Sequence, residues 1–157
     1  MRRECEARIT VKASAETVWS VISDVTRVGE WSGECQSCEW VGDSVEPAPG
    51  SRFRGGNRRG WMRWTRLSEI DFADAPKEIV WHTVPSGIYR DSTEWRVSLR
   101  PAPDGTEVTE SFRILRLARP MESLLGLVQP AHRDRSKDLA DDLARLKKVV
   151  EATAPST

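Results

Sequence analysis

The stretch that decides the fold is PMESLLGLVQPAHRDRSKDLADDLARLKKVVE, residues 120–151. Apolar side chains recur along it at steps of three, four and seven, and the series already begins just upstream. Such spacing forms one stripe along an α-helix, whose members here are Leu117, Met121, Leu124, Val128, Leu139, Leu143, Leu146 and Val150. The pattern predicts one long C-terminal helix with a single buried face.

Two polar residues, His132 and Arg135, stand in the gap of this stripe. A charged or titratable side chain on a buried face needs a partner or a function. Pro130 cannot donate a backbone hydrogen bond to Gly126, so we expect the helix to bend or start afresh there. The half from Leu139 onward is predicted to pack in the core, and the half up to Arg135 to form the lid and mouth of a pocket.

Upstream of this helix the chain alternates in polarity. Residues Glu6 to Lys12 predict a first strand, Ser14 can cap a helix after it, and residues 29–33 suggest a second short helix or a turn. Residues 35–114 predict about six further strands, and every second residue from Met62 to Phe72 shares one face. Strands in one run with segregated helices predict an α+β fold with a curved antiparallel sheet.

The length and charge restrict the class of protein. A chain of 157 residues is most simply one domain, predicted over residues 1–151 with a disordered tail at 152–157. Its 24 basic and 24 acidic residues cancel, which argues against general attraction to nucleic acid or an anionic membrane. No apolar run has the length of a signal peptide or a membrane span, so we expect a cytoplasmic protein without membrane insertion. Monomer and homodimer both remain open.

Three cysteines, Cys5, Cys35 and Cys38, suit a reducing compartment. Cys35-x-x-Cys38 has the spacing of a redox motif or of half a zinc site. A zinc site needs a second pair of ligands, and a thioredoxin-like motif opens a helix, whereas CQSCEWVG predicts a strand. We therefore interpret the pair as structural and predict no metal site and no cofactor.

Several stretches together resemble the START-like (SRPBCC) superfamily, which includes polyketide cyclase/dehydrase proteins, lipid-transfer START domains and birch-pollen-allergen relatives. They are SAETVWSVISDVTRVGEW (14–31), GSRFRGGNRRG (50–60), KEIVWHTVPS (77–86), STEW (92–95) and DGTEVTESFRILR (104–116), and the resemblance spans residues 3–150. It implies the helix-grip fold, in which a seven-stranded sheet wraps the C-terminal helix and leaves an apolar cavity. Members bind lipids, sterols or polyketides, and a minority catalyse cyclisation or dehydration. The superfamily has no shared catalytic signature that could be transferred to this chain.

Strand parity assigns one set of side chains to the inner face of the sheet. The apolar members, with two from the helix, are Phe53, Trp64, Trp81, Trp95, Phe112, Leu124 and Val128. The polar members, with Tyr89 from a loop and two residues from the helix, are Asn57, Arg66, Ser68, Thr83, Tyr89, Thr93, Glu110, His132 and Arg135. An apolar cavity with few polar groups suits a small molecule, and flat indoles suit a planar or polycyclic one.

Three residues are candidates for catalysis: Glu110, Arg135 and His132. A buried carboxylate needs a neutralising cation, for which Arg66 and Arg135 are the candidates. Glu110 is then either an orienting or acid–base group, or a structural residue that is ion-paired or turned outward by a bulge; the structural alternatives are favoured. If His132 lies at the mouth of the pocket, it can act as a proton shuttle. If it lies on the outer surface, we expect no functional role.

The six arginines between Arg52 and Arg66, with Trp61 and Trp64, are open to interpretation as a nucleic-acid surface. Most of these arginines occupy strand positions that point toward solvent, where acidic residues of neighbouring strands can pair with them. A charged outer face of the sheet is therefore favoured. His82 shares that outer parity. No Ser-His-Asp order, HExxH motif or metal-ligand cluster occurs.

Three functions follow from these features. The first is a module that binds a hydrophobic small molecule (a lipid, polyketide or aromatic compound) between the sheet and the last helix. The second is a polyketide cyclase, aromatase or dehydratase in which the cavity positions the substrate. The third is a regulatory or toxin–antitoxin-type interaction protein.

Overall fold

The computed structural model describes residues 4–87, 90–116 and 135–153. Its elements, in chain order, are β1 (Glu4–Val11), α1 (Ala15–Ile22), a 3₁₀ turn η1 (Val25–Arg27), α2 (Val28–Trp31), β2 (Cys35–Val41), β3 (Arg52–Arg59), β4 (Met62–Asp74), β5 (Glu78–Thr83), β6 (Ser92–Ala102), β7 (Gly105–Arg116) and α4 (Ser136–Thr153).

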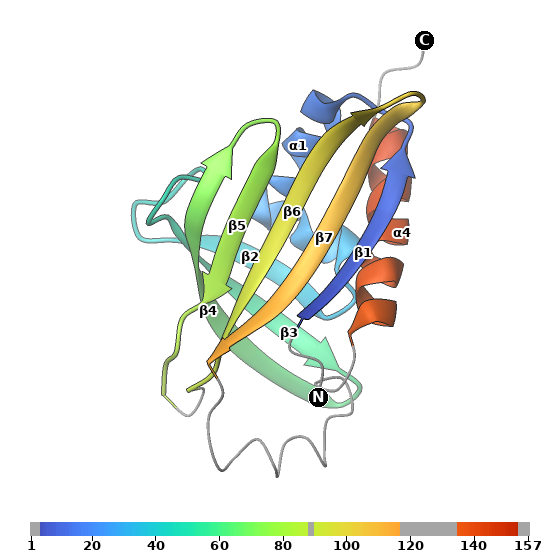
Figure 1. The fold of residues 1–157 in the computed structure, drawn as a ribbon. Helices are drawn as coiled ribbons and strands as arrows, with labels where there is room; N and C mark the ends of the chain where they lie inside the picture. Colours follow the sequence, from blue (N-terminus) through green and yellow to red (C-terminus); the bar gives the residue numbers. More distant parts are fainter. Residues whose placement is uncertain (1–3, 88–89, 117–134, 154–157) are drawn as a thin grey trace.

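The seven strands form one antiparallel sheet in the order β1-β7-β6-β5-β4-β3-β2. The sheet curves strongly, and α4 lies along it beside β1 (Figure 1). The two short helices α1 and α2 follow the first strand and lie on the same side of the sheet as α4. This arrangement confirms the α+β prediction and is the helix-grip fold.

Helix α4 carries the second half of the predicted apolar stripe. Leu139, Leu143, Leu146 and Val150 are all buried, as the 3.6-residue period predicts. The helix begins at Ser136 and continues through Thr153, two residues beyond the predicted domain boundary at residue 151. The first half of the stripe, including Leu117, Met121, Leu124, Val128 and His132, lies outside the described residues.

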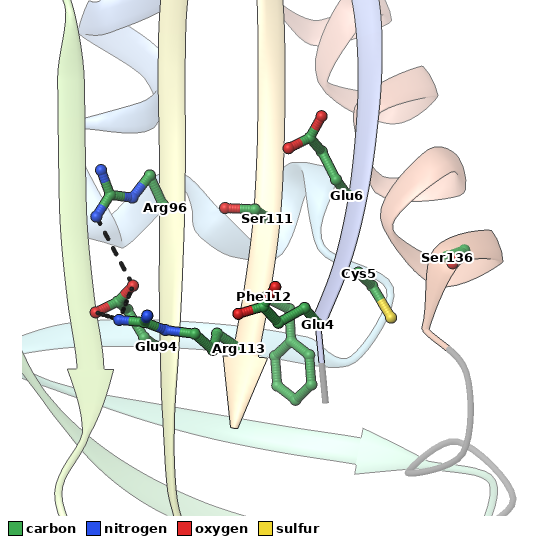
Figure 2. Close-up of a pocket in the computed structure, with 9 residues that line it drawn as sticks. All are labelled: Glu4, Cys5, Glu6, Glu94, Arg96, Ser111, Phe112, Arg113 and Ser136. Carbon is green, nitrogen blue, oxygen red and sulfur yellow. Dashed lines mark hydrogen bonds and ion pairs between the residues drawn. The ribbon is translucent and has the colours of Figure 1, made fainter. Parts of the chain in front are cut away.

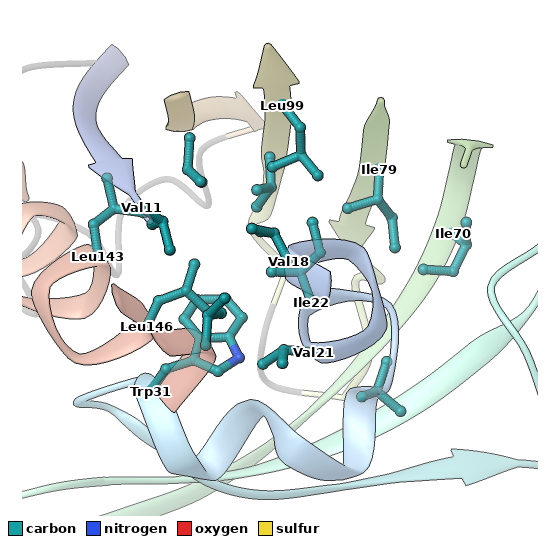
Figure 3. Packing of buried hydrophobic residues seen from close by; sticks show 14 of the residues in the cluster. Val11, Val18, Val21, Ile22, Trp31, Ile70, Ile79, Leu99, Leu143 and Leu146 are labelled. Carbon is teal, nitrogen blue, oxygen red and sulfur yellow. The ribbon is translucent and has the colours of Figure 1, made fainter. Parts of the chain in front are cut away.

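The main core lies between α1, α4 and the sheet (Figure 3). Its members include Val18 and Ile22 from α1, Leu143 and Leu146 from α4, and Leu99 on β6. The backbone amide of Lys12, just after β1, donates to Glu151 of α4 at 2.9 Å, and the Lys147 side chain donates to the Thr10 carbonyl at 2.9 Å. These two contacts fix the helix to this edge of the sheet. A second, smaller buried cluster consists of Cys5, Phe112 and Leu139, and Trp95 packs against it.

The inner face predicted for β4 is wrong at the C-terminal end of the strand. Phe72 is exposed, although alternation from Met62 places it inward. The pairing of β4 with β5 shifts between Ile70 and Phe72, which makes Asp71 an extra residue in a β-bulge. Beyond the bulge the parity reverses, so Ala73 packs against the core in place of Phe72.

Helix α1 begins as the sequence predicts. The Ser14 side chain accepts a hydrogen bond from the backbone amide of Thr17 at 3.2 Å. Ser14→Ala should lower the free energy of unfolding by about 1 kcal/mol, because one amide of the first turn loses its partner. Urea denaturation measures this loss. Ser20→Ala on the exposed side of the same helix is the control and should cost less than the cap; equal losses for the two variants would contradict a capping role.

None of the described helices is long and apolar enough to cross a membrane.

Candidate functional site

A row of large side chains crosses the concave face of the sheet. Cross-strand pairing sets Ile70, Trp81, Trp95, Phe112 and Cys5 opposite one another on β4, β5, β6, β7 and β1. The Trp81 and Trp95 rings are nearly parallel, with centroids 6.4 Å apart and planes 9° apart. Trp95 also contacts Phe112, with centroids 4.9 Å apart. Both indoles are only partly buried, so together they present flat aromatic surface.

The row continues toward the other edge of the sheet. Phe53 on β3 contacts Trp81 edge-on at 6.2 Å between centroids, and Trp40 on β2 contacts Phe53 at 6.1 Å. Five rings from five strands thus form one connected series, which we call the aromatic row: Trp40, Phe53, Trp81, Trp95 and Phe112. Four of the five were predicted from parity; Trp40 was not.

Hydroxyl groups border the aromatic row on one side. Thr83 pairs with Ser68, and its hydroxyl lies 3.0 Å from the hydroxyl of Thr93 and accepts the Thr93 backbone amide at 2.9 Å. Ser92 donates to the Thr83 carbonyl at 2.8 Å. These polar groups hold β5 and β6 together at the point where their pairing ends.

Glu110 borders the aromatic row on the other side. Its direct cross-strand neighbours are Val97 and Ala7, and only 2% of its surface is exposed. Its Oε2 atom is buried and has no hydrogen-bond partner among the residues that the structure describes. Burial, helped by the negative charge of Asp142 and opposed by Arg135, raises the pKa of Glu110 to about 8. At neutral pH the group is therefore a neutral carboxylic acid able to donate a proton.

The predicted cation partners of Glu110 have other partners. Arg66 donates to both carboxylate oxygens of Asp91, at 3.2 and 3.1 Å, and to the Asp91 carbonyl at 3.1 Å. Arg135 forms an ion pair with Glu34, and its Nε atom lies 4.0 Å from the Asp138 carboxylate. Among the described residues no ion pair joins Glu110 to Arg66 or Arg135, although the charge of Arg135 still acts on Glu110, and the burial of Glu110 argues against an outward bulge.

Arg135 nevertheless lies at the site. Its guanidinium carbon is 5.1 Å from the centre of the Trp95 ring and 5.3 Å from that of Phe112. Both distances are within the range of cation–π attraction. Arg135 immediately precedes α4, and Glu34 immediately precedes β2, so their pair fixes the start of the helix against that strand. One end of the aromatic row is therefore covered by a fixed positive charge.

Asp142 completes this polar group from α4. Burial raises the pKa of Asp142, while hydrogen bonds from the Gly33 amide and from Arg145 oppose the rise. Sequence reasoning missed Asp142 and Glu34. Asp142 falls three residues after Leu139, inside the buried stripe, and that spacing was a usable signal.

The remaining predicted site residues are Asn57 and Trp64, near the β3–β4 turn, and four residues outside the described part of the chain. Asn57 and Trp64 oppose each other near the β3–β4 turn, and Asn57 also pairs with Cys35 on β2. The role of these two residues in ligand binding stays a prediction. Predictions for Tyr89, Leu124, Val128 and His132 lie outside the described residues.

A separate hollow of about 520 Å³ opens at the end of β1, β7 and β6 (Figure 2). Its lining is mostly charged or polar: Glu4, Cys5, Glu6, Glu94, Arg96, Ser111, Phe112, Arg113 and Ser136. Of the predicted site residues that the structure describes, it contains only Phe112. Glu94 pairs there with Arg113 at 3.1 Å and with Arg96 at 3.8 Å. These ion pairs make the hollow unsuitable for a hydrophobic ligand, so we place the candidate site at the aromatic row.

The outer face of the sheet carries paired charges. Arg52 bonds Glu69 at 2.9 Å and Arg54 lies 3.8 Å from Glu39, as the favoured interpretation of the arginine run expects. His82 also lies outside, 2.8 Å from Asp71.

Glu69, Asp71 and His82 offer ligand atoms within 4.8 Å of one another, a grouping that sequence analysis did not predict. The contacts with Arg52 and between Asp71 and His82 account for all three side chains without an ion.

A curved antiparallel sheet that wraps a C-terminal helix, with an aromatic inner face, defines a helix-grip protein. The profile of the family described as "Polyketide cyclase / dehydrase and lipid transport" matches residues 2–151, so the chain belongs to this family. Comparison with curated protein sequences found no significant match.

Solved structures show the same fold. TTHA0849 from Thermus thermophilus superposes with a TM-score of 0.73 at 21% identity, over 97% of this chain and 99% of that one. The polyketide-cyclase-like protein Cgl2372 from Corynebacterium glutamicum gives 0.63 at 23% identity, over 96% and 92%. DynU16, from the dynemicin biosynthetic locus, gives 0.65 at 16% identity, over 99% of this chain and 49% of its own. At these identities the likeness concerns the fold.

Proposed function

We propose that the protein binds a hydrophobic, flat small molecule of aromatic or polyketide type on the aromatic row. The observation that carries the proposal is the parallel, partly exposed pair of Trp81 and Trp95. A planar ligand can stack on this surface by offset contact. Family membership supports this class of ligand, and so does the shared fold of DynU16, which belongs to a biosynthetic locus.

Two polar groups would orient such a ligand. A protonated Glu110 donates a hydrogen bond to a carbonyl or hydroxyl oxygen, and Arg135 attracts an anionic or electron-rich oxygen. The proposed ligand is therefore apolar over most of its length, with an oxygen at one end.

Native mass spectrometry of the purified protein and quenching of Trp fluorescence by a panel of flavonoids, anthraquinones and fatty acids test the binding. Trp95→Leu should weaken the best aromatic ligand about tenfold, because one stacking surface is lost. Trp61→Leu is the control, since Trp61 is 88% exposed at the β3–β4 turn. If no panel member binds, or if both variants weaken binding equally, the proposal is wrong.

A second candidate function is an enzyme of cyclase, aromatase or dehydratase type. Glu110 favours it, because a buried acid with a pKa of about 8 can protonate a leaving hydroxyl or an enolate at neutral pH. The test is turnover of a synthetic poly-β-ketone. Glu110→Gln should abolish turnover and retain binding; turnover unchanged in this variant would exclude Glu110 as the acid.

A further inference from the structure

The two cysteines of the CQSC stretch share one side of β2. In a regular strand, residues three apart point to opposite faces. Here Cys35 opposes Asn57 and Ser37 opposes Gly56, so Gln36 is an extra residue in a β-bulge. The bulge reverses the parity between the cysteines, and their sulfur atoms lie 3.0 Å apart.

The neighbouring strand leaves room for both sulfurs. Gly55 on β3 pairs with Cys38, and a Cβ atom there would lie 3.3 Å from the Cys35 sulfur and 3.4 Å from the Cys38 sulfur. Such contacts are tight, so a larger residue at this position would press on the pair. Both cysteines are partly buried, and both are free.

The two thiols differ in acidity. The hydrogen bond from Cys38 lowers the pKa of Cys35, although burial and the nearby carboxylates of Glu34 and Asp142 oppose this effect. The same hydrogen bond and burial raise the pKa of Cys38. The thiolate therefore forms first on Cys35, and the thiolate is the reactive form of a cysteine.

We propose that Cys35 and Cys38 form a redox-active dithiol that closes to an intramolecular disulfide, with a low-molecular-weight disulfide as oxidant. The Cys35 thiolate attacks one sulfur of the oxidant, forms a mixed disulfide and expels one thiolate, which takes up the proton that Cys35 released. Cys38 then loses its proton and attacks the Cys35 sulfur, which expels the second thiol. Two protein thiols are oxidised, and one small disulfide is reduced to two thiols.

Closure requires little movement. The sulfur atoms must approach by about 1 Å to reach the disulfide bond length of about 2.05 Å. In reducing compartments the disulfides that do form are commonly transient and catalytic or sensing, while structural disulfides are rare. The bulge and Gly55 thus distinguish this pair from two cysteines that are near only in sequence.

The experiment equilibrates the folded protein with mixtures of oxidised and reduced glutathione, then counts thiols and maps peptides by mass spectrometry. The free thiols should fall from three to one, with a Cys35–Cys38 link and Cys5 still reduced as the internal control. Cys38→Ser should stop at a mixed disulfide on Cys35, and Cys35→Ser should react more slowly. Retention of all three thiols, or a wild-type protein that stops at the mixed disulfide, would overturn the proposal.

Two comparisons test whether the folded structure favours formation of the Cys35–Cys38 disulfide. The folded protein should close the disulfide at a lower ratio of oxidised to reduced glutathione than the same protein in urea. Gly55→Ala keeps both cysteines and should shift that ratio relative to wild type. Equal ratios in the folded and urea-unfolded protein would show that the site depends on sequence spacing alone, against the proposal.

Discussion

Replacing Glu110 by Gln is expected to remove a fall in stability that the wild-type protein shows as the pH rises from about 5 to about 8. In the unfolded chain a glutamate ionises near pH 4.5, whereas burial raises the pKa of Glu110 in the folded protein to about 8. Between these values the folded state holds a proton that the unfolded state has released. Stability is therefore fully present below the unfolded pKa and is lost as the pH rises through the folded one.

The size of this effect is large for one side chain. Each pH unit inside the window changes the free energy of unfolding by up to about 1.4 kcal/mol, and the total is on the order of a few kcal/mol. Gln has nearly the same shape and no proton to lose. The two proteins should be similarly stable at about pH 4, and the variant clearly more stable at about pH 9.

Urea denaturation across this pH range measures the difference. Glu107→Gln, on the outward side of the same strand, is the matched control and should keep the wild-type slope. A carbonyl-stretching band of a protonated carboxyl, present in wild type at neutral pH and missing in Glu110→Gln, gives an independent reading. Parallel pH profiles for wild type and Glu110→Gln would contradict a neutral buried acid.

The inward position of Glu110 was predictable because strand alternation has a period of two. Val108, Glu110 and Phe112 alternate with polar residues, and all three are buried. The lower helical stripe was predictable for the same kind of reason, since Leu139 to Val150 repeat at helical spacing. Periodicity thus predicted which face of most strands and helices is buried. The buried strand faces in turn predicted four of the five residues of the aromatic row.

What periodicity could not supply is pairing between distant segments. Arg135 bonds Glu34 across 101 positions of sequence, and Arg66 bonds Asp91 across 25. Each arginine had several acidic candidates, and only the curvature of the sheet decides among them. The bulges at Gln36 and Asp71 were hidden for a related reason, because an extra residue is visible only in the register of two paired strands.

The Arg135–Glu34 pair leads to the second large effect. Arg135→Met should lower the free energy of unfolding by about 3 kcal/mol, because it leaves a partly buried carboxylate without its cation. The Arg135 side chain is 11% exposed and that of Glu34 is 26% exposed, so solvent screens the pair only in part. Met retains much of the apolar contact of the arginine stem with Trp95 and Phe112. The loss therefore reports mainly on charge.

A double-mutant cycle separates the pair from its surroundings. Glu34→Gln alone should cost less than Arg135→Met, and the double variant should recover part of the loss, with a coupling energy of about 1–3 kcal/mol. Lys137→Met is the control for a lost cation, since Lys137 is 88% exposed and pairs only with Asp141 among the described residues; it should change stability by less than about 0.5 kcal/mol.

The same variant tests the electrostatic coupling at the site. Arg135 is the cation that opposes the rise in the pKa of Glu110, so its removal should extend the upper end of the pH-dependent fall in stability above pH 8. If Arg135→Met costs no more than Lys137→Met and leaves this pH profile in place, then the guanidinium does not act on Glu110. A cost no larger than that of Lys137→Met would also mean that the Arg135–Glu34 pair does not stabilise the contact between the start of α4 and β2.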